Sequence, residues 1–290
     1  MIGNVLGVLF DGLAYGSLLF IIAVGLSVTL GLMNFVNLAH GAFAMLGGYA
    51  CVALLNRAGV PFLAALPLAA LAAGLAGVVL ERTLYRRLYG ASHLDQVLFS
   101  IGLVFVSVSA ATYLFGSQQQ PLQLPAYLSG QWRLPGLDMG VYRVLLIAIG
   151  LALAIGLQWL VARTRFGARL RASVDNPRAA RGTGIDVDRV FVTTFALGSA
   201  LAGLGGALGI EMLGLDPEFP IKYIVYFLIV VAVGGGGNIQ GSLYASLILG
   251  VCDVAGKYYV PQVGSFVIYA VMVVMLIFRP QGLFGRRAAR

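Results

Sequence analysis

The residues best suited to chemistry in this sequence are two asparagines and a histidine inside a long apolar stretch. Asn34, Asn37 and His40 follow one another at intervals of three residues, so on a helix they would share one face. Polar groups in apolar surroundings must be satisfied by protein groups or by a water-lined cavity. Two interpretations stay open: a broken helix near 31–41 whose Asn34, Asn37, His40 and Gly41 line a substrate path, or interhelical hydrogen bonds that only lock packing.

A second polar interruption is the glycine cluster at 234–241. Four consecutive glycines precede Asn238, and Gln240 and Gly241 follow. A nucleotide-binding loop would need a Gly-Lys-Ser/Thr ending, which this sequence lacks. Because glycine is a poor helix former, the cluster predicts a break or a re-entrant segment between two apolar helices. Either Asn238 and Gln240 line a path, or the cluster is a tight turn that lets two helices approach closely.

No set of residues typical of catalysis or metal binding accompanies these segments. The only other histidine is His93, and Cys51 and Cys252 both lie in apolar runs. We therefore expect no enzyme activity, no metal and no cofactor. Asp253 and Lys257 lie within one helical turn of each other, which predicts a local ion pair.

Composition restricts the class of protein. Of the 290 residues, 60% are hydrophobic and 10% are charged, and the mean hydropathy is +0.92. A soluble domain is about half apolar and about a quarter charged. The sequence therefore excludes a soluble enzyme and a disordered chain. It predicts an all-α, polytopic integral membrane protein.

Apolar runs long enough for membrane helices follow one another along the chain. No basic leader precedes the first run, so we expect it to be retained. The predicted spans are 5–30, 36–55, 62–80, 97–115, 142–162, 190–212, 222–236, 240–256 and 263–278. The spans at 222–236 and 240–256 are short, so the count is eight or nine. We expect residues 1–290 to form one transmembrane domain.

The positive charges cluster between these spans and predict the orientation. The net charge is +8, and the arginines gather at 82–87, at 163–189 and at 279–290. Since Lys and Arg are retained on the cytoplasmic side, we place all three segments there, with the N-terminus outside. The basic excess thus indicates membrane orientation and contact with lipid, and we expect no nucleic-acid partner.

The basic segment at 163–189 contains a helix start signal. Asn176 is a good N-cap, Pro177 suits the first helical turn, and Gly184 favours a stop. We expect a short amphipathic helix with arginines outward and Ala179 and Ala180 inward, docked into a groove on a partner. The alternative is a solvated basic loop near anionic lipid.

Together these segments resemble the LivH-type permease subunit of the branched-chain amino acid ABC importer family. The resemblance covers nearly the whole chain. It is carried by the Asp-Gly-Leu-Ala-Tyr-Gly opening at 11–16, the Asn-Phe-x-Asn-x-Ala-His-Gly core at 34–41 and the glycine turn at 234–241. It implies an ATPase-coupling loop with an Ala-Ala-x-x-x-Gly core, and its residues are Asp175, Asn176, Pro177, Arg178, Ala179, Ala180, Gly184 and Ile185. Arg178 stands where that motif usually has Glu.

The resemblance also implies partners and a location. The expected partners are a second homologous permease, two cytoplasmic ATP-binding subunits that hydrolyse ATP, and a periplasmic substrate-binding protein. The expected location is the bacterial inner membrane, with the C-terminus cytoplasmic. Leucine, isoleucine and valine are the leading substrates, and other amino acids, urea or amides are alternatives. The residues alone leave open a self-sufficient secondary transporter or channel that uses Asp253, Glu211 or His40.

Overall fold

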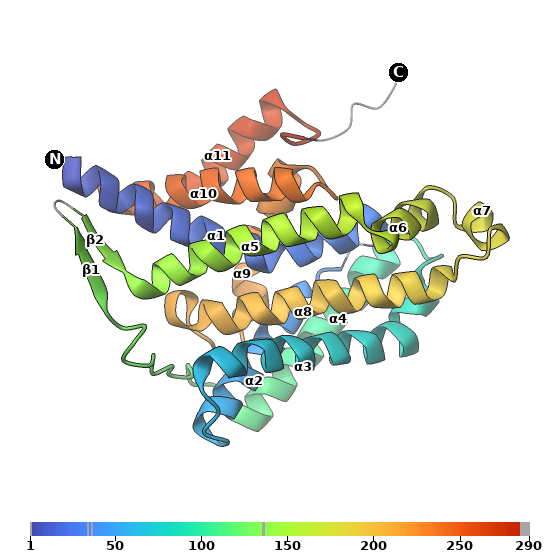
Figure 1. Ribbon diagram of the computed structural model, residues 1–290, viewed down its shortest axis with the longest axis horizontal. Helices are drawn as coiled ribbons and strands as arrows, with labels where there is room; N and C mark the ends of the chain where they lie inside the picture. Colours follow the sequence, from blue (N-terminus) through green and yellow to red (C-terminus); the bar gives the residue numbers. More distant parts are fainter. Residues whose placement is uncertain (1, 34, 36, 135–136, 285–290) are drawn as a thin grey trace.

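The protein is a bundle of long helices whose axes mostly follow one direction (Figure 1). The computed structural model describes residues 2–33, 35, 37–134 and 137–284. The helices in chain order are α1 (Ile2–Met33), α2 (His40–Asn56), α3 (Phe62–Thr83), the 3-10 turn η1 (Tyr85–Leu88), α4 (His93–Phe115), α5 (Val141–Arg163), α6 (Arg165–Asp175), α7 (Pro177–Gly182), α8 (Val187–Leu213), α9 (Phe219–Gly234), α10 (Ile239–Tyr259) and α11 (Gly264–Phe278).

Each predicted span coincides with one helix, and the all-α polytopic fold is confirmed. Within the described residues, six helices are long and apolar enough to cross a membrane, namely α1, α3, α4, α5, α8 and α10. The helices α2, α9 and α11 are apolar but shorter. The count of eight or nine crossings therefore stays a prediction.

One element was not predicted. In the segment 116–141, strand β1 (Gln131–Leu134) pairs antiparallel with strand β2 (Leu137–Gly140), with Gln131 opposite Gly140. The hairpin lies beside the N-terminus, at the end of the bundle opposite α7 (Figure 1). Residues 131–134 alternate polar and apolar side chains, a short strand signal that the sequence analysis did not use.

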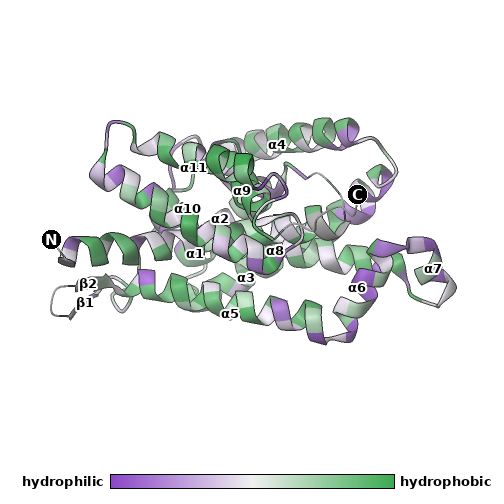
Figure 2. Cartoon of the chain, turned by 90° about the horizontal axis from the view of Figure 1, so that it is seen from above, coloured by the Kyte–Doolittle hydropathy of each residue, from purple (hydrophilic) through white to green (hydrophobic). Residues whose placement is uncertain are grey.

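Helix α1 lies at the centre of the bundle and packs against α8 and α10. In α1, 89% of the most apolar stretch is buried, whereas the corresponding values are 17% in α4 and 22% in α5. The apolar outer faces of α4 and α5 are typical of helices that face lipid, and Figure 2 shows their predominantly hydrophobic colouring.

Small residues allow the central helices to approach closely. A Cβ atom built on Gly12 would lie 2.6 Å from the Cα atom of Val251. Ser27 on α1 and Ser242 on α10 share a hydrogen bond of 2.9 Å between their hydroxyl oxygens. Close approach at small residues and hydrogen bonds between hydroxyls are the usual means of helix association in membranes.

Candidate functional site

The break between α1 and α2 is made by Asn37 itself. Helix α1 ends at Met33 and α2 begins at His40, so Asn37 is not helical. The predicted break near 31–41 is therefore confirmed, and Asn37 and His40 do not share a helix face. Asn37 Oδ1 accepts a hydrogen bond from the backbone N–H of Ala39 at 3.1 Å, and such local bonds compete with helix formation. Asn34 lies outside the described residues.

The polar groups at the break are buried and bonded to protein. The hydroxyl of Tyr85, in η1, donates to Asn37 Oδ1 at 2.9 Å. His40 Nε2 donates to the carbonyl oxygen of Ile22, in α1, at 2.8 Å. Gly41 faces Pro220 at the start of α9, where a Cβ atom would lie 2.9 Å from the Cα atom of Pro220. These contacts join the break to α1, η1 and α9.

Aromatic side chains hold the break against its neighbours. The ring of Phe35 meets the rings of Tyr85 and Tyr89 edge-on, at 5.3 Å and 5.8 Å between centroids. Tyr85 also lies 4.6 Å from Phe195 of α8, centroid to centroid. Burial raises the pKa of the Tyr85 hydroxyl, which therefore stays protonated and remains a donor to Asn37. Tyr85 therefore links η1 directly to the break.

The glycine cluster forms a turn between α9 and α10. Gly235 and Gly237 have φ values of 88° and 81°, which glycine adopts without strain. Asn238 caps α10, because its Oδ1 accepts from the backbone N–H of Gly241 at 3.0 Å. Its Nδ2 donates to the carbonyl oxygen of Phe284 at 3.4 Å, and Gln240 is exposed. Among the described residues, no hydrogen bond joins this turn to Asn37 or His40.

The predicted start and end of the short helix in the basic segment are confirmed. Helix α6 ends at Asp175 and Asn176 caps α7, since its Oδ1 accepts from the backbone N–H of Ala179 at 3.0 Å. Pro177 occupies the first turn of α7. Gly184 has a φ of 84°, and the chain leaves α7 through this left-handed position.

The predicted orientation of α7 is only half correct. Ala180 is buried as expected, but Ala179 is exposed beside the exposed Arg178. The carbonyl oxygen of Ala180 accepts from the backbone N–H of half-buried Ile185 at 3.1 Å and from the Thr183 hydroxyl at 2.8 Å. A helix of six residues has room for one buried position on its inner face, and Ala180 takes it. Ala179 therefore belongs to the surface that α7 presents outward.

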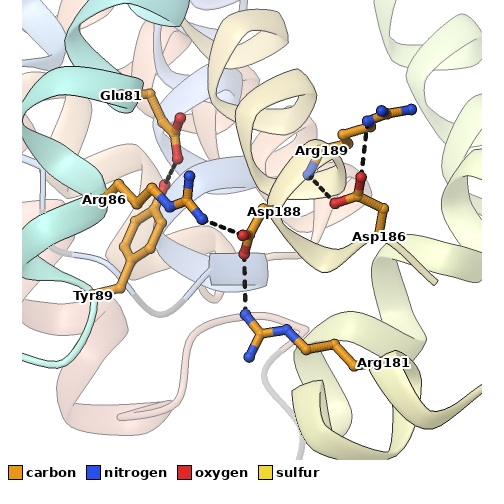
Figure 3. A network of polar contacts seen from close by, with 7 residues as sticks. All are labelled: Glu81, Arg86, Tyr89, Arg181, Asp186, Asp188 and Arg189. Carbon is orange, nitrogen blue, oxygen red and sulfur yellow. Dashed lines mark hydrogen bonds and ion pairs between the residues drawn. The ribbon is translucent and has the colours of Figure 1, made fainter. Parts of the chain in front are cut away.

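An ion-pair network, not found by the sequence analysis, connects α7 to two other elements (Figure 3). Asp188, at the start of α8, pairs with Arg181 of α7 at 3.0 Å and with Arg86 of η1. We call Arg86, Asp188 and Arg181 the connector network. The side chains are half-exposed, so each pair contributes little energy, but one carboxylate holds three elements in register.

Beside the connector network lies a buried carboxylate. Glu81 of α3 is 1% exposed, and its Oε1 accepts a hydrogen bond from the hydroxyl of Tyr89 at 2.7 Å (Figure 3). Burial, and next the hydrogen bond to Glu81, raise the pKa of Tyr89, so the hydroxyl stays protonated. Glu81 follows directly after the predicted span 62–80, and nothing in the sequence indicated its contact with Tyr89.

Two ion pairs lie on the long helices. The predicted pair of Asp253 and Lys257 is confirmed, with 2.6 Å between Oδ2 and Nζ. Asp11 of α1 pairs with Arg143 of α5, a contact that the sequence did not predict. Glu211 lies near the end of α8. Within the described ranges, no group of three or more His, Cys, Asp or Glu side chains is placed to hold a metal ion.

Comparisons with known proteins agree with this arrangement. The sequence profile of a family described as "Branched-chain amino acid transport system / permease component" matches residues 8–276. The chain is 26% identical to the permease protein BraD of a Pseudomonas aeruginosa high-affinity branched-chain amino acid transport system, over 96% of this chain and 95% of BraD. No solved structure gave a significant match.

Two further relatives have the same kind of printed name, permease proteins of high-affinity branched-chain amino acid transport systems. LivH of Escherichia coli K12 is 26% identical over 96% of this chain and 94% of LivH. LivM of Salmonella typhimurium is 27% identical over 91% of this chain and 67% of LivM. Since the family profile spans nearly the whole helical bundle, the chain belongs to the branched-chain amino acid transport system permease family, as a LivH-type permease.

Proposed function

We propose that this chain is one of two permease subunits of an ATP-binding cassette importer that moves amino acids, foremost leucine, isoleucine and valine. The printed names of BraD and LivH support the substrate class, and the LivM match supports pairing with a second, homologous permease. ATP hydrolysis belongs to two cytoplasmic partner subunits, and a periplasmic binding protein delivers the amino acid. The location is the bacterial inner membrane.

The observation that carries this proposal is the capped helix α7, which presents an outward surface and is tied inward at Ala180 and Asp188. The exposed residues Pro177, Arg178 and Ala179 form the docking surface for an ATPase subunit. Arg178 brings a positive charge to this surface, so the facing groove on the ATPase is acidic at that point.

Force on α7 has a physical route to the break between α1 and α2. Arg181 of α7 forms an ion pair with Asp188 at the start of α8, and Asp188 also forms an ion pair with Arg86 of η1. The next element of the route is Tyr85, whose hydroxyl is bonded to Asn37. Rigid elements joined by discrete contacts of this kind can change state together. In the proposed cycle, movement of α7 shifts η1 and changes access along a path lined by Asn34, Asn37, His40, Gly41, Asn238 and Gln240.

The proposed function also implies an orientation in the membrane. The connector network lies at the end of the bundle that carries α6 and α7, where Figure 2 shows many hydrophilic residues. We assign that end and the C-terminus to the cytoplasm and the β1–β2 hairpin and N-terminus to the periplasm.

Other cargoes and another driving force remain as alternatives. The binding protein sets most of the selectivity in such systems, so another amino acid, urea or an amide is the alternative cargo. The buried carboxylate of Asp253 favours a second function, a self-sufficient ion-coupled transporter. The two functions differ in whether transport requires ATPase partners.

Uncoupling variants of α7 test the proposal in the assembled complex. We expect Ala179→Glu, which changes only the exposed surface, and Gly184→Arg, which strains a left-handed position, to abolish ATP-dependent leucine uptake while the ATPase subunits still hydrolyse ATP. Arg165→Gln, on exposed α6, is the matched control and keeps uptake. Full uptake with both α7 variants contradicts a coupling role for α7.

A further inference from the structure

Asp253 carries a buried carboxylate oxygen without a partner. The side chain is 1% exposed, and its Oδ2 accepts from Lys257 Nζ at 2.6 Å. Its Oδ1 is buried and has no hydrogen-bond partner among the described residues. Burying a charged oxygen without a hydrogen bond is costly. Such an oxygen is a candidate to receive a proton donor from outside the chain.

Tyr15 of α1 and Tyr226 of α9 lie within electrostatic range of this carboxylate. Tyr15 of α1 interacts electrostatically with Asp253 and with the tyrosines of α9 and α11. The latter are Tyr223, Tyr226 and Tyr269. Lys257 Nζ lies 5.6 Å from the centre of the Tyr15 ring. Four helices thus bring polar groups of both signs and aromatic faces together in one place.

The aromatic side chains form a row that leads away from the ion pair. Tyr226 and Tyr269 lie next to each other, with their ring centroids 6.1 Å apart. Tyr223 follows at 6.1 Å from Tyr226, and Phe219 at 4.8 Å from Tyr223. These rings give a continuous apolar surface with hydroxyl groups at its edge.

The charges and the row together match one class of ligand. A primary ammonium group would supply the hydrogen bond that Asp253 Oδ1 lacks, close to the ring of Tyr15. A carboxylate fits Lys257, whose side chain is 47% exposed and whose ammonium has donors beyond the one used by Asp253. An aliphatic side chain fits the row of rings. A zwitterionic α-amino acid with an apolar side chain has all three groups.

We propose that Asp253, Lys257 and Tyr15, with Tyr226 and Tyr269, form a binding site for the head group of an apolar α-amino acid within the permease. This inference rests on the proposed function. It adds a binding site for the substrate between α1, α9, α10 and α11. Tyr226 and Tyr269 are half-buried, and separation of their two neighbouring rings opens the row to the ligand. We call these five residues the zwitterion site.

The test uses the assembled permease–ATPase complex in lipid nanodiscs without the binding protein. Direct binding of labelled L-leucine is measured for the wild type, Asp253→Asn and Lys257→Gln. Loss of a charge-assisted hydrogen bond is expected to weaken leucine binding roughly 10- to 100-fold in each variant. Asp11→Asn, which alters the other carboxylate paired between long helices, is the matched control and binds leucine as the wild type does.

Competition by two leucine analogues separates recognition from a merely structural role. 4-Methylpentanoate lacks the ammonium group, and 3-methylbutylamine lacks the carboxylate. The wild type should prefer leucine over both. Asp253→Asn should lose most of the preference over 4-methylpentanoate, and Lys257→Gln most of the preference over 3-methylbutylamine. A structural defect instead weakens all three ligands alike and overturns the site.

Different experimental results would overturn the zwitterion site and the proposed function. Unchanged leucine affinity and preference in Asp253→Asn overturn the site, as does a wild-type complex that takes up leucine but binds none in nanodiscs. A wild-type complex that shows no ATP-driven uptake of any amino acid overturns the proposed function itself. If Asp253→Asn does not assemble, Lys257→Gln carries the test, since glutamine still donates to Asp253 Oδ2.

Discussion

Asp188 and Asp253 are both paired with basic residues, yet they are used in opposite ways. Asp188 is half-exposed, and its two oxygens are taken by arginines from η1 and α7. Asp253 is buried, and its single partner, Lys257, lies on the same helix. The first carboxylate joins separate parts of the chain. The second joins only two residues of one helix, and its other oxygen has no partner among the described residues.

This difference has an energetic side. An exposed ion pair contributes about 0–1 kcal/mol to stability, so the main effect of the connector network is to position α7, α8 and η1 relative to one another. Removing one partner of a buried pair costs about 3–5 kcal/mol, because a charge is left without compensation in a poor solvent for it. The two regions should therefore respond very differently to substitution.

The largest effect is expected from Lys257→Met. Because Lys257 is half-exposed, we expect a loss near the lower end of that range, about 3 kcal/mol in the free energy of unfolding. Denaturant titration of the purified protein in detergent measures it. The double variant Asp253→Asn with Lys257→Met should regain most of the loss. A double variant no more stable than the single one would show that Asp253 is not charged in the folded protein.

A middle-sized effect is expected where the connector network reaches the break. Tyr85→Phe removes the hydroxyl that donates to Asn37 and leaves the ring in its place. We expect about 0.5–1.5 kcal/mol of destabilisation by thermal or chemical unfolding. Thr83→Val, which removes an exposed hydroxyl bonded only to its own helix, is the control and should have no measurable effect. Equal stability of Tyr85→Phe and the wild type would remove this step from the proposed route.

A smaller loss of stability but a clear loss of coupling is expected from Asp188→Asn. Stability should fall by less than about 1 kcal/mol, because the pairs are exposed. Uptake per ATP hydrolysed should fall several-fold, since α7 is no longer tied to η1. Asp186→Asn is the matched control: it loses a pair with Arg189 of the same helix and keeps the cap of α8. If both variants lower the uptake-to-hydrolysis ratio equally, the connector network has no special role.

The smallest effect is that of salt. Surface ion pairs are screened at high ionic strength, while buried ones are screened much less. Raising NaCl from about 0.05 M to about 0.5 M should reduce the stability difference between Asp188→Asn and the wild type to near zero. The cost of Lys257→Met should change little in the same series of unfolding measurements. A salt effect of the same size on both would mean that the two carboxylates are equally exposed.

What could be predicted from the sequence follows from local signals. Each span was predicted from the length of an apolar run, and the start of α7 from Asn176 before Pro177. Asp253 and Lys257 were paired correctly because they lie on one turn of one helix. The break near 31–41 was predicted from the polar residues that interrupt an apolar run, but the side-chain bond between Asn37 and Ala39 within it cannot be read from residue spacing.

Contacts between distant segments could not be predicted. Arg86 lies 102 residues from Asp188, and Arg143 lies 132 residues from Asp11. Such pairs depend on which helix ends meet, and a single sequence does not contain that information. The exposure of Ala179 was missed for a related reason: on so short a helix, neighbouring elements decide the buried face. The unpartnered oxygen of Asp253 likewise emerges only when α1, α9 and α11 are in place.

The central claim is that an ATPase partner drives transport through this chain. The most direct measurement is uptake of labelled leucine into proteoliposomes that contain this permease, its second permease and the binding protein, with and without the two ATPase subunits. We expect uptake only when the ATPase subunits and ATP are present. Uptake by this chain alone, driven by an ion gradient, would contradict it.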